Sequence, residues 1–143
     1  MNTLGIILIS HGEFARAALD SAQMIAGPQE DVIALALTVS KSLDEFEKEI
    51  ADSYNQLILN HQDIIVLCDI YGGTPFNALS RCMLKGMSMI GFTGLNLPVL
   101  IDLLLSRELS GEEAKVKIME THAIACMPVN VTFVEDDDDI SDL

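Results

Sequence analysis

Four short, mostly apolar runs constrain the fold of this chain more than any other feature. Three of them are Leu4 to Ser10, Val32 to Val39 and Asp63 to Ile70, and a weaker one is Ser88 to Phe92. An unbroken apolar run of this length is typical of a strand buried on both faces, as in a parallel sheet. Strand and helix alternate four times. We therefore expect an α/β fold with a doubly wound, mostly parallel sheet in the order 2-1-3-4.

Helix signals fill the stretches between these strands. Ser42 and Ser110 are each followed three residues later by a glutamate, which is the pattern of a capping box. In the glycine turn before the third helix, Thr74 can serve as the cap and Pro75 suits the first helical position. The spacing of apolar residues predicts helices over Glu13 to Ala26, Leu43 to Ile58, Phe76 to Lys85, Val99 to Arg107 and Glu112 to Ala125.

The end of the chain has a different character. Pro128 to Val134 alternates apolar and polar residues and predicts a last strand. Glu135 to Leu143 begins with five consecutive acids and is expected to be a disordered tail. Residues 1–134 are then a single domain, and 135–143 lie outside it.

Charge and cysteine content narrow the class of protein. The net charge of -14 would repel phosphate backbones, so we expect no nucleic acid partner. No signal peptide is visible, and no apolar run reaches the roughly 18 residues of a membrane span. Cys68, Cys82 and Cys126 are odd in number and lie far apart in apolar segments. They indicate buried thiols in a reducing cytoplasm rather than a metal site or disulfides.

Two strand ends carry the polar residues that suggest chemistry. The first strand runs into Ser10-His11-Gly12, and the third runs into Asp69 and the turn Gly72-Gly73. In a doubly wound sheet the first and third strands are neighbours, and ligands bind at their carboxyl ends. We therefore expect His11 and Asp69 to lie in one crevice, with the N-termini of helices pointing toward it.

This set of residues favours a phosphoryl acceptor. A nucleophilic histidine needs one bare ring nitrogen and one that is hydrogen-bonded, and Asp69 is placed to accept the second bond. Helix N-terminal amides at Gly12, Gly72 and Gly73, with the Thr74 hydroxyl, would bind phosphoryl oxygens. Asp69 has no acidic cluster beside it. We therefore expect no metal and no cofactor, and a protein rather than ATP as the phosphoryl donor.

Three motifs together carry a family resemblance. They are the apolar strand ending in Ser10-His11-Gly12, the segment Asp69-Ile70-Tyr71-Gly72-Gly73-Thr74-Pro75, and Gly94-Leu95-Asn96-Leu97-Pro98. In this combination they resemble the IIA domain of the mannose family of the phosphoenolpyruvate-dependent sugar phosphotransferase system. The likeness covers nearly the whole chain, and the pairing of the first two motifs is specific.

The resemblance implies a cytoplasmic phosphotransferase. His11 would accept a phosphoryl group from the phosphocarrier protein HPr and pass it to a histidine of a IIB protein, while Asp69 orients the ring. IIB then phosphorylates the sugar during transport through membrane permease subunits. The resemblance also implies a homodimer in which the last strand, Pro128 to Val134, pairs antiparallel with the partner's sheet. Since the chain ends at Leu143, IIB is expected to be a separate polypeptide.

Other assignments stay open at this point. The phosphoryl donor domain of a dihydroxyacetone kinase system shares the fold and the histidine. A receiver-like domain would be phosphorylated on Asp69, but it needs acids at the end of the first strand. A nucleotide-binding module would need several glycines there, and Gly12 is the one present. The other two histidines, His61 and His122, are expected to be structural.

Overall fold

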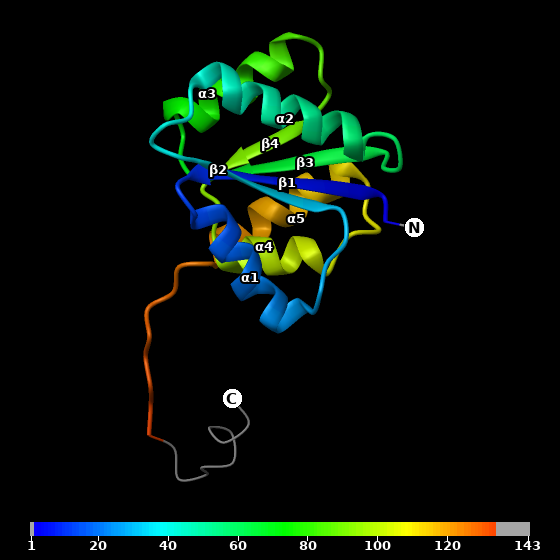
Figure 1. Cartoon of the computed structure of the whole chain (residues 1–143). Helices are drawn as coiled ribbons and strands as arrows, with labels where there is room; N and C mark the ends of the chain where they lie inside the picture. The colour runs from blue at the N-terminus through cyan, green and yellow to red at the C-terminus, as the bar shows by residue number, and fades with distance from the viewer. Residues whose placement is uncertain (1, 134–143) are drawn as a thin grey trace.

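Strands and helices alternate along the chain as the sequence predicts. The computed structural model describes residues 2–133, which Figure 1 shows. The strands are β1 (Leu4–His11), β2 (Val32–Leu37), β3 (Asp63–Cys68) and β4 (Ile90–Thr93). The helices are α1 (Phe14–Ala26), α2 (Leu43–Leu57), α3 (Gly73–Leu84), α4 (Leu97–Leu104) and α5 (Gly111–Ala123).

The sheet has the predicted order and direction. Its strands lie in the order β2-β1-β3-β4, and each neighbouring pair is parallel. The carboxyl ends of β1 and β3 are therefore adjacent at one edge of the sheet, with Ile9 of β1 opposite Cys68 of β3. Within the described residues, no helix is both long and apolar enough to span a membrane.

Helices cover both faces of the sheet. Figure 1 shows α2 and α3 on one face and α1, α4 and α5 on the other. Alternate side chains of β1 serve the two layers: Leu4, Ile6 and Leu8 pack in the core with α1 and α4, whereas Ile7 and Ile9 pack in the core with α2 and α3. This alternation is the normal consequence of a strand's two-residue period.

Some helix ends differ from the prediction for local reasons. The capping boxes at Ser42 and Ser110 are both confirmed. α3 begins three residues before Phe76, at Gly73, and the cap position is Gly72 with no side-chain cap. Thr74 as the cap was therefore wrong, because two glycines with positive φ let the chain turn directly from strand into helix.

Arg107 explains why α4 ends earlier than predicted. The helix stops at Leu104, whereas the sequence pattern predicted helix as far as Arg107. The Arg107 side chain is buried, and its guanidinium donates to the carbonyl oxygens of Leu4, Glu30 and Asp31. These hydrogen bonds hold Arg107 at the amino ends of β1 and β2, so the residue does not continue the helix.

From the end of α5 to residue 133, where the described residues end, the chain has no helix or strand. Residues 127–133 leave the body of the molecule as the orange segment of Figure 1. Over residues 128–133 the predicted last strand therefore does not form within the single chain, and its pairing with a second copy stays a prediction. Val134 and the predicted tail, 135–143, lie outside the described residues.

The cysteines follow the prediction at two of three positions. Cys68 and Cys82 are buried, whereas Cys126 is exposed. The prediction for Cys126 was wrong because α5 ends at Ala123, before the cysteine, and the chain then leaves the core.

Candidate functional site

His11 and Asp69 meet at the carboxyl edge of the sheet. β1 ends at His11, and the Asp69 amide donates to the Ile9 carbonyl oxygen (3.1 Å), which extends the contact between β1 and β3 by one residue. His11 Nδ1 lies 2.8 Å from Asp69 Oδ2, and the His11 backbone amide donates to the same oxygen at 2.9 Å. One carboxylate oxygen therefore holds both the backbone and the ring of His11.

The charge state of Asp69 decides the tautomer of His11. Burial raises the pKa of the Asp69 carboxyl, but hydrogen bonds from the His11 amide, the His11 ring and the Ile70 amide outweigh it, so the pKa lies below its ordinary value. An ionised carboxylate can only accept hydrogen bonds. Nδ1 therefore carries the proton in the neutral ring, and Nε2 keeps its lone pair.

The start of α3 lies against Nε2. Gly73 has φ +85°, and a Cβ placed on it would lie 3.2 Å from His11 Cε1 and 3.3 Å from Nε2. Only glycine allows this close approach without moving the ring. The amides of the first helical turn have no partner inside a helix, and the positive end of the helix dipole is located there. The surroundings of Nε2 therefore suit a negatively charged group.

The predicted phosphate-binding residues fall into two sets. Gly72, Gly73 and Thr74 form the start of α3, next to the ring. The amide of Gly12 is already engaged, because it donates to the Leu37 carbonyl oxygen at 2.8 Å. At the start of α1, the Ala15 amide is engaged as well, by the Ser10 hydroxyl. The α3 side therefore offers the better anion site, whereas the sequence suggested both helices equally.

The Cys68 thiol lies below the carboxylate of Asp69. Its Sγ is 3.6 Å from Asp69 Oδ1, and burial raises the pKa of the thiol to about 12. The thiol therefore stays protonated at neutral pH and does not compete with His11 as a nucleophile. His11, whose side chain is 48% exposed, is the accessible nucleophile at this edge.

Four exposed apolar side chains follow these two residues in the chain or begin a nearby helix. Phe14 begins α1 three residues after His11, Ile70 and Tyr71 directly follow Asp69, and Leu97 begins α4. Phe14 and Leu97 line one shallow groove. The sequence pattern placed Ile70 in the third strand, whereas β3 ends at Cys68 and leaves Ile70 exposed. We call these four residues the apolar rim.

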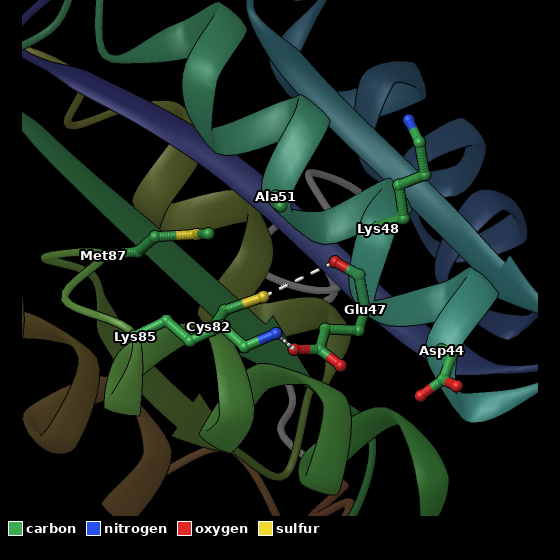
Figure 2. Close-up of a pocket in the computed structure, with 7 residues that line it drawn as sticks. All are labelled: Asp44, Glu47, Lys48, Ala51, Cys82, Lys85 and Met87. Carbon is green, nitrogen blue, oxygen red and sulfur yellow. Dashed lines mark hydrogen bonds and ion pairs between the residues drawn. The ribbon is translucent and has the colours of Figure 1, made fainter.

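A separate hollow lies between α2 and α3. Figure 2 shows it, with Glu47 directed at Lys85 and with the Cys82 thiol bonded to the Glu47 backbone. Glu47 Oε1 lies 2.6 Å from Lys85 Nζ, and the hydrogen bond from Lys85 lowers the pKa of Glu47. These charges neutralise each other, and none of the lining residues is at a strand end. We therefore assign the candidate site to His11.

Comparison with known proteins shows the family to which the chain belongs. Residues 5–120 match the model of the family described as the PTS system fructose IIA component. The chain belongs to this family. It is thus a component of the phosphotransferase system, and its general role is phosphoryl transfer in sugar uptake.

Individual relatives extend the comparison. The chain is 29% identical over 105 residues to the PTS system fructose-specific EIIA component of Bacillus subtilis, covering 73% of this chain and 71% of that protein. It is 28% identical over 109 residues to the mannose-specific EIIAB component of Escherichia coli, covering 74% of this chain and 32% of that longer protein. The chain therefore spans about a third of EIIAB.

A solved structure shows the same fold. The mannose/sorbose specific IIA subunit from Enterococcus faecalis superposes with a TM-score of 0.82 at 25% identity, covering 92% of this chain and 98% of that one. The resemblance found in the sequence motifs is thereby confirmed at the level of the family. The match favours the IIA assignment over a receiver-like domain or a nucleotide-binding module.

Proposed function

We propose that Nε2 of His11 accepts a phosphoryl group from HPr and passes it to a histidine of a IIB protein. One observation carries the proposal. Nδ1 is held on Asp69 at 2.8 Å, which leaves Nε2 as the free nitrogen on an exposed ring beside the start of α3. A histidine nucleophile needs this combination of one occupied and one bare nitrogen.

The transfer exchanges one nitrogen–phosphorus bond for another. The Nε2 lone pair of His11 attacks the phosphorus of phosphorylated HPr, and the electrons of the breaking bond return to the HPr histidine. Positive charge then develops on the His11 ring, and the adjacent Asp69 carboxylate stabilises it. The first-turn amides of Gly73 and Thr74, together with the helix dipole, stabilise the phosphoryl oxygens. In the second transfer a IIB histidine attacks the phosphorus, and the electrons of the breaking bond return to Nε2 of His11.

The apolar rim supports a protein as the donor and as the acceptor. Tyr71 is 80% exposed, and Phe14, Ile70 and Leu97 add further exposed apolar surface around the histidine. Exposed apolar side chains gathered at one place are typical of protein-binding surfaces. HPr and IIB would dock here in turn, and the membrane permease subunits would be reached through IIB. All of these steps would take place in the cytoplasm.

We further propose that residues 1–134 are the phosphocarrier domain and that two copies form a homodimer. Val129, Val131 and Phe133 are exposed at alternate positions, with Val129 at 91%. Within the described residues, β4 pairs with β3 on one side and has its other edge free. An alternating apolar segment and a free strand edge on the same chain favour pairing between two copies. The segment 128–134 would add an antiparallel strand to the partner's β4.

The dimer is tested by replacing the apolar side chains of this segment. The variant Val129→Asp/Val131→Asp should elute as a monomer in size-exclusion chromatography with light scattering, whereas the wild type has the mass of two chains. The control is Val39→Asp, which alters an exposed valine after β2, on the opposite side of the sheet from β4. A wild-type monomer, or a double variant that stays dimeric, would show that the segment does not join two copies.

The transfer is tested by intact mass. The full chain is mixed with phosphoenolpyruvate, enzyme I and HPr, and its mass is measured before and after brief acid treatment. We expect a gain of one phosphoryl group that acid removes, as for a phosphohistidine, with peptide mapping to His11. A gain from acetyl phosphate alone would move the acceptor to Asp69 and support a receiver-like role. No gain from either donor would contradict the proposal.

A further inference from the structure

The residue before His11 is a serine whose side chain is completely buried. Ser10 has no exposed surface, although it lies one residue from an exposed ring. Its Oγ accepts a hydrogen bond from the Ala15 amide at 2.7 Å and donates one to the Gly12 carbonyl oxygen at 3.3 Å. One hydroxyl thus joins the end of β1, the turn after His11 and the first turn of α1.

Strand alternation explains this position. Leu4, Ile6 and Leu8 point to the layer of α1 and α4, so Ser10, two residues further on, points to the same layer. His11 points to the opposite layer, where Gly73 begins α3. Ser10 therefore holds the end of the strand from one face while the His11 ring lies on the other.

The bond from Ala15 replaces an ordinary helix cap. The N-cap residue of α1 is Glu13, which forms no side-chain cap hydrogen bond. A buried amide without a partner destabilises the fold, and the Ser10 hydroxyl supplies that partner for Ala15. The same hydroxyl also fixes Gly12, which has φ +55° in the turn directly after the histidine.

We propose that Ser10 is a positioning residue for phosphoryl transfer, acting through the backbone of His11; this rests on the proposed function. Asp69 Oδ2 accepts from both the His11 amide and the His11 ring. Both bonds survive only if the His11 backbone keeps its place relative to β3. The Ser10 hydroxyl keeps it there, and so holds Nδ1 on Asp69 and Nε2 beside Gly73.

The test compares full-length wild type with Ser10→Ala, Ser10→Thr and Ser110→Ala. Ser110 is the matched control because its hydroxyl also accepts a first-turn amide, that of Glu113. Ser110 lies at the amino ends of the strands, far from His11, where the neighbouring Gly111 amide donates to Asp63 at the start of β3. Three quantities are measured: the maximal phosphorylation rate with phosphorylated HPr, the HPr concentration at half that rate, and the NMR shifts of the His11 ring nitrogens.

For Ser10→Ala we expect a maximal rate about 10- to 100-fold lower, because small misplacements of a reacting group have effects of this size. The half-saturating HPr concentration should change little. The chemical shifts of the His11 ring nitrogens should move from the values of a single tautomer toward the average of two tautomers. Ser10→Thr keeps the hydroxyl and should restore both the rate and the shifts. Ser110→Ala should lose stability and keep the wild-type rate and ring signals.

Two results would overturn the role of Ser10. One is a Ser10→Ala variant that is less stable but has the wild-type rate and ring signals, which would make Ser10 a helix cap alone. The other is an equal loss of rate in Ser10→Ala and Ser110→Ala. If the wild type accepts no phosphoryl group, the proposed function fails instead. The ring signals still decide the role of Ser10 in that case, because they need no donor.

Discussion

The sheet carries one histidine–aspartate pair at the carboxyl ends of its strands and another at their amino ends. His11 and Asp69 pair at 2.8 Å where β1 and β3 end. His61 and Asp31 pair at 2.9 Å where β3 and β2 are about to begin. The distances are nearly equal, so pairing with a carboxylate does not by itself distinguish a functional histidine from a structural one.

The second ring nitrogen makes the difference. His61 Nδ1 lies 2.8 Å from the Asn2 carbonyl oxygen while Nε2 faces Asp31, and the side chain is 3% exposed. Both nitrogens of His61 are thus engaged, and neither can attack an incoming group. In His11 one nitrogen is held and the other is left beside the start of α3. A histidine available for chemistry is recognised by the nitrogen that the fold leaves open.

The surroundings of the two pairs agree with this distinction. At the amino edge, the buried Arg107 guanidinium closes the gap between β1 and β2 by donating to backbone carbonyl oxygens. Burial lowers the pKa of Arg107, which nevertheless stays charged at neutral pH because an arginine pKa begins so high. At the carboxyl ends of the strands, Asp69 is mostly buried, whereas the His11 ring is half exposed. The amino ends are therefore closed by buried hydrogen bonds, while the carboxyl ends leave Nε2 of His11 accessible.

The largest effects should come from replacing His11 or His61 with alanine, one at a time. His11→Ala should abolish phosphoryl acceptance and change the free energy of unfolding by less than about 1 kcal/mol, because the side chain is half exposed. His61→Ala should keep acceptance and lose about 2 kcal/mol, because it removes a buried ring with two hydrogen bonds. Intact mass and urea unfolding measure both.

His122→Ala is the control for this exchange, since His122 lies exposed near the end of α5. It should change neither quantity. A His11→Ala variant that still gains an acid-labile phosphoryl group would remove the distinction between the two pairs.

The carboxylates should differ in the same way, with a smaller effect on rate. Asp69→Asn should slow phosphoryl acceptance by about 100-fold, because an amide in place of the carboxylate favours the wrong ring tautomer. Asp31→Asn is the matched control, and its left-handed backbone (φ 57°) is one that asparagine tolerates. We expect Asp31→Asn to keep the wild-type rate. Equal rates for Asp69→Asn and wild type would refute the orienting role.

Two adjacent glycines test the space beside Nε2. Gly72 and Gly73 have φ values of +83° and +85°, so alanine strains the backbone at both positions. A Cβ at Gly73 would press on the His11 ring, whereas one at Gly72 meets nothing within 4 Å. Gly73→Ala should therefore lower the rate about tenfold further than Gly72→Ala does. Single-turnover phosphorylation by HPr compares them, and equal rates would mean that α3 does not confine the ring.

Much of the fold could be predicted from the sequence, because each signal involved is local. Buried parallel strands are short and apolar, and capping boxes occupy four consecutive residues. The strand order followed from the alternation of strand and helix. The start of α3 and the end of α4 could not be predicted in this way. They depend on two positive-φ glycines and on Arg107, whose partners lie far away along the chain.

The candidate site could be predicted in its residues but only partly in its arrangement. That His11 and Asp69 would meet followed from the strand order. The sequence pattern predicted the same role for Gly12 and Gly73. The structure separates the two residues, because the Gly12 amide donates to Leu37 while Gly73 lies against the His11 ring. The hydrogen bonds of the buried Ser10 hydroxyl could not be predicted either, since they depend on where the turn places Gly12 and Ala15.

The smallest expected effect is the pH dependence of stability at the Asp69 site. The pKa of Asp69 is lower in the folded protein than its ordinary value, so the ionised carboxylate stabilises the fold. This stabilisation is fully present above the ordinary carboxyl pKa of about 4 and is lost as the pH falls through the folded pKa. The difference in unfolding free energy between wild type and Asp69→Asn should therefore be constant near neutral pH and shrink in acid.

Urea unfolding over a pH series measures this difference, and His11→Ala supplies a second background for it. The backbone amides of position 11 and of Ile70 still donate to Asp69 in that background, so the pH-dependent difference should become smaller without disappearing. A difference that grows as the pH falls would show that the fold favours a protonated Asp69. A protonated carboxyl could donate to Nδ1 and leave the proton on Nε2, which would remove the open nitrogen that separates His11 from His61.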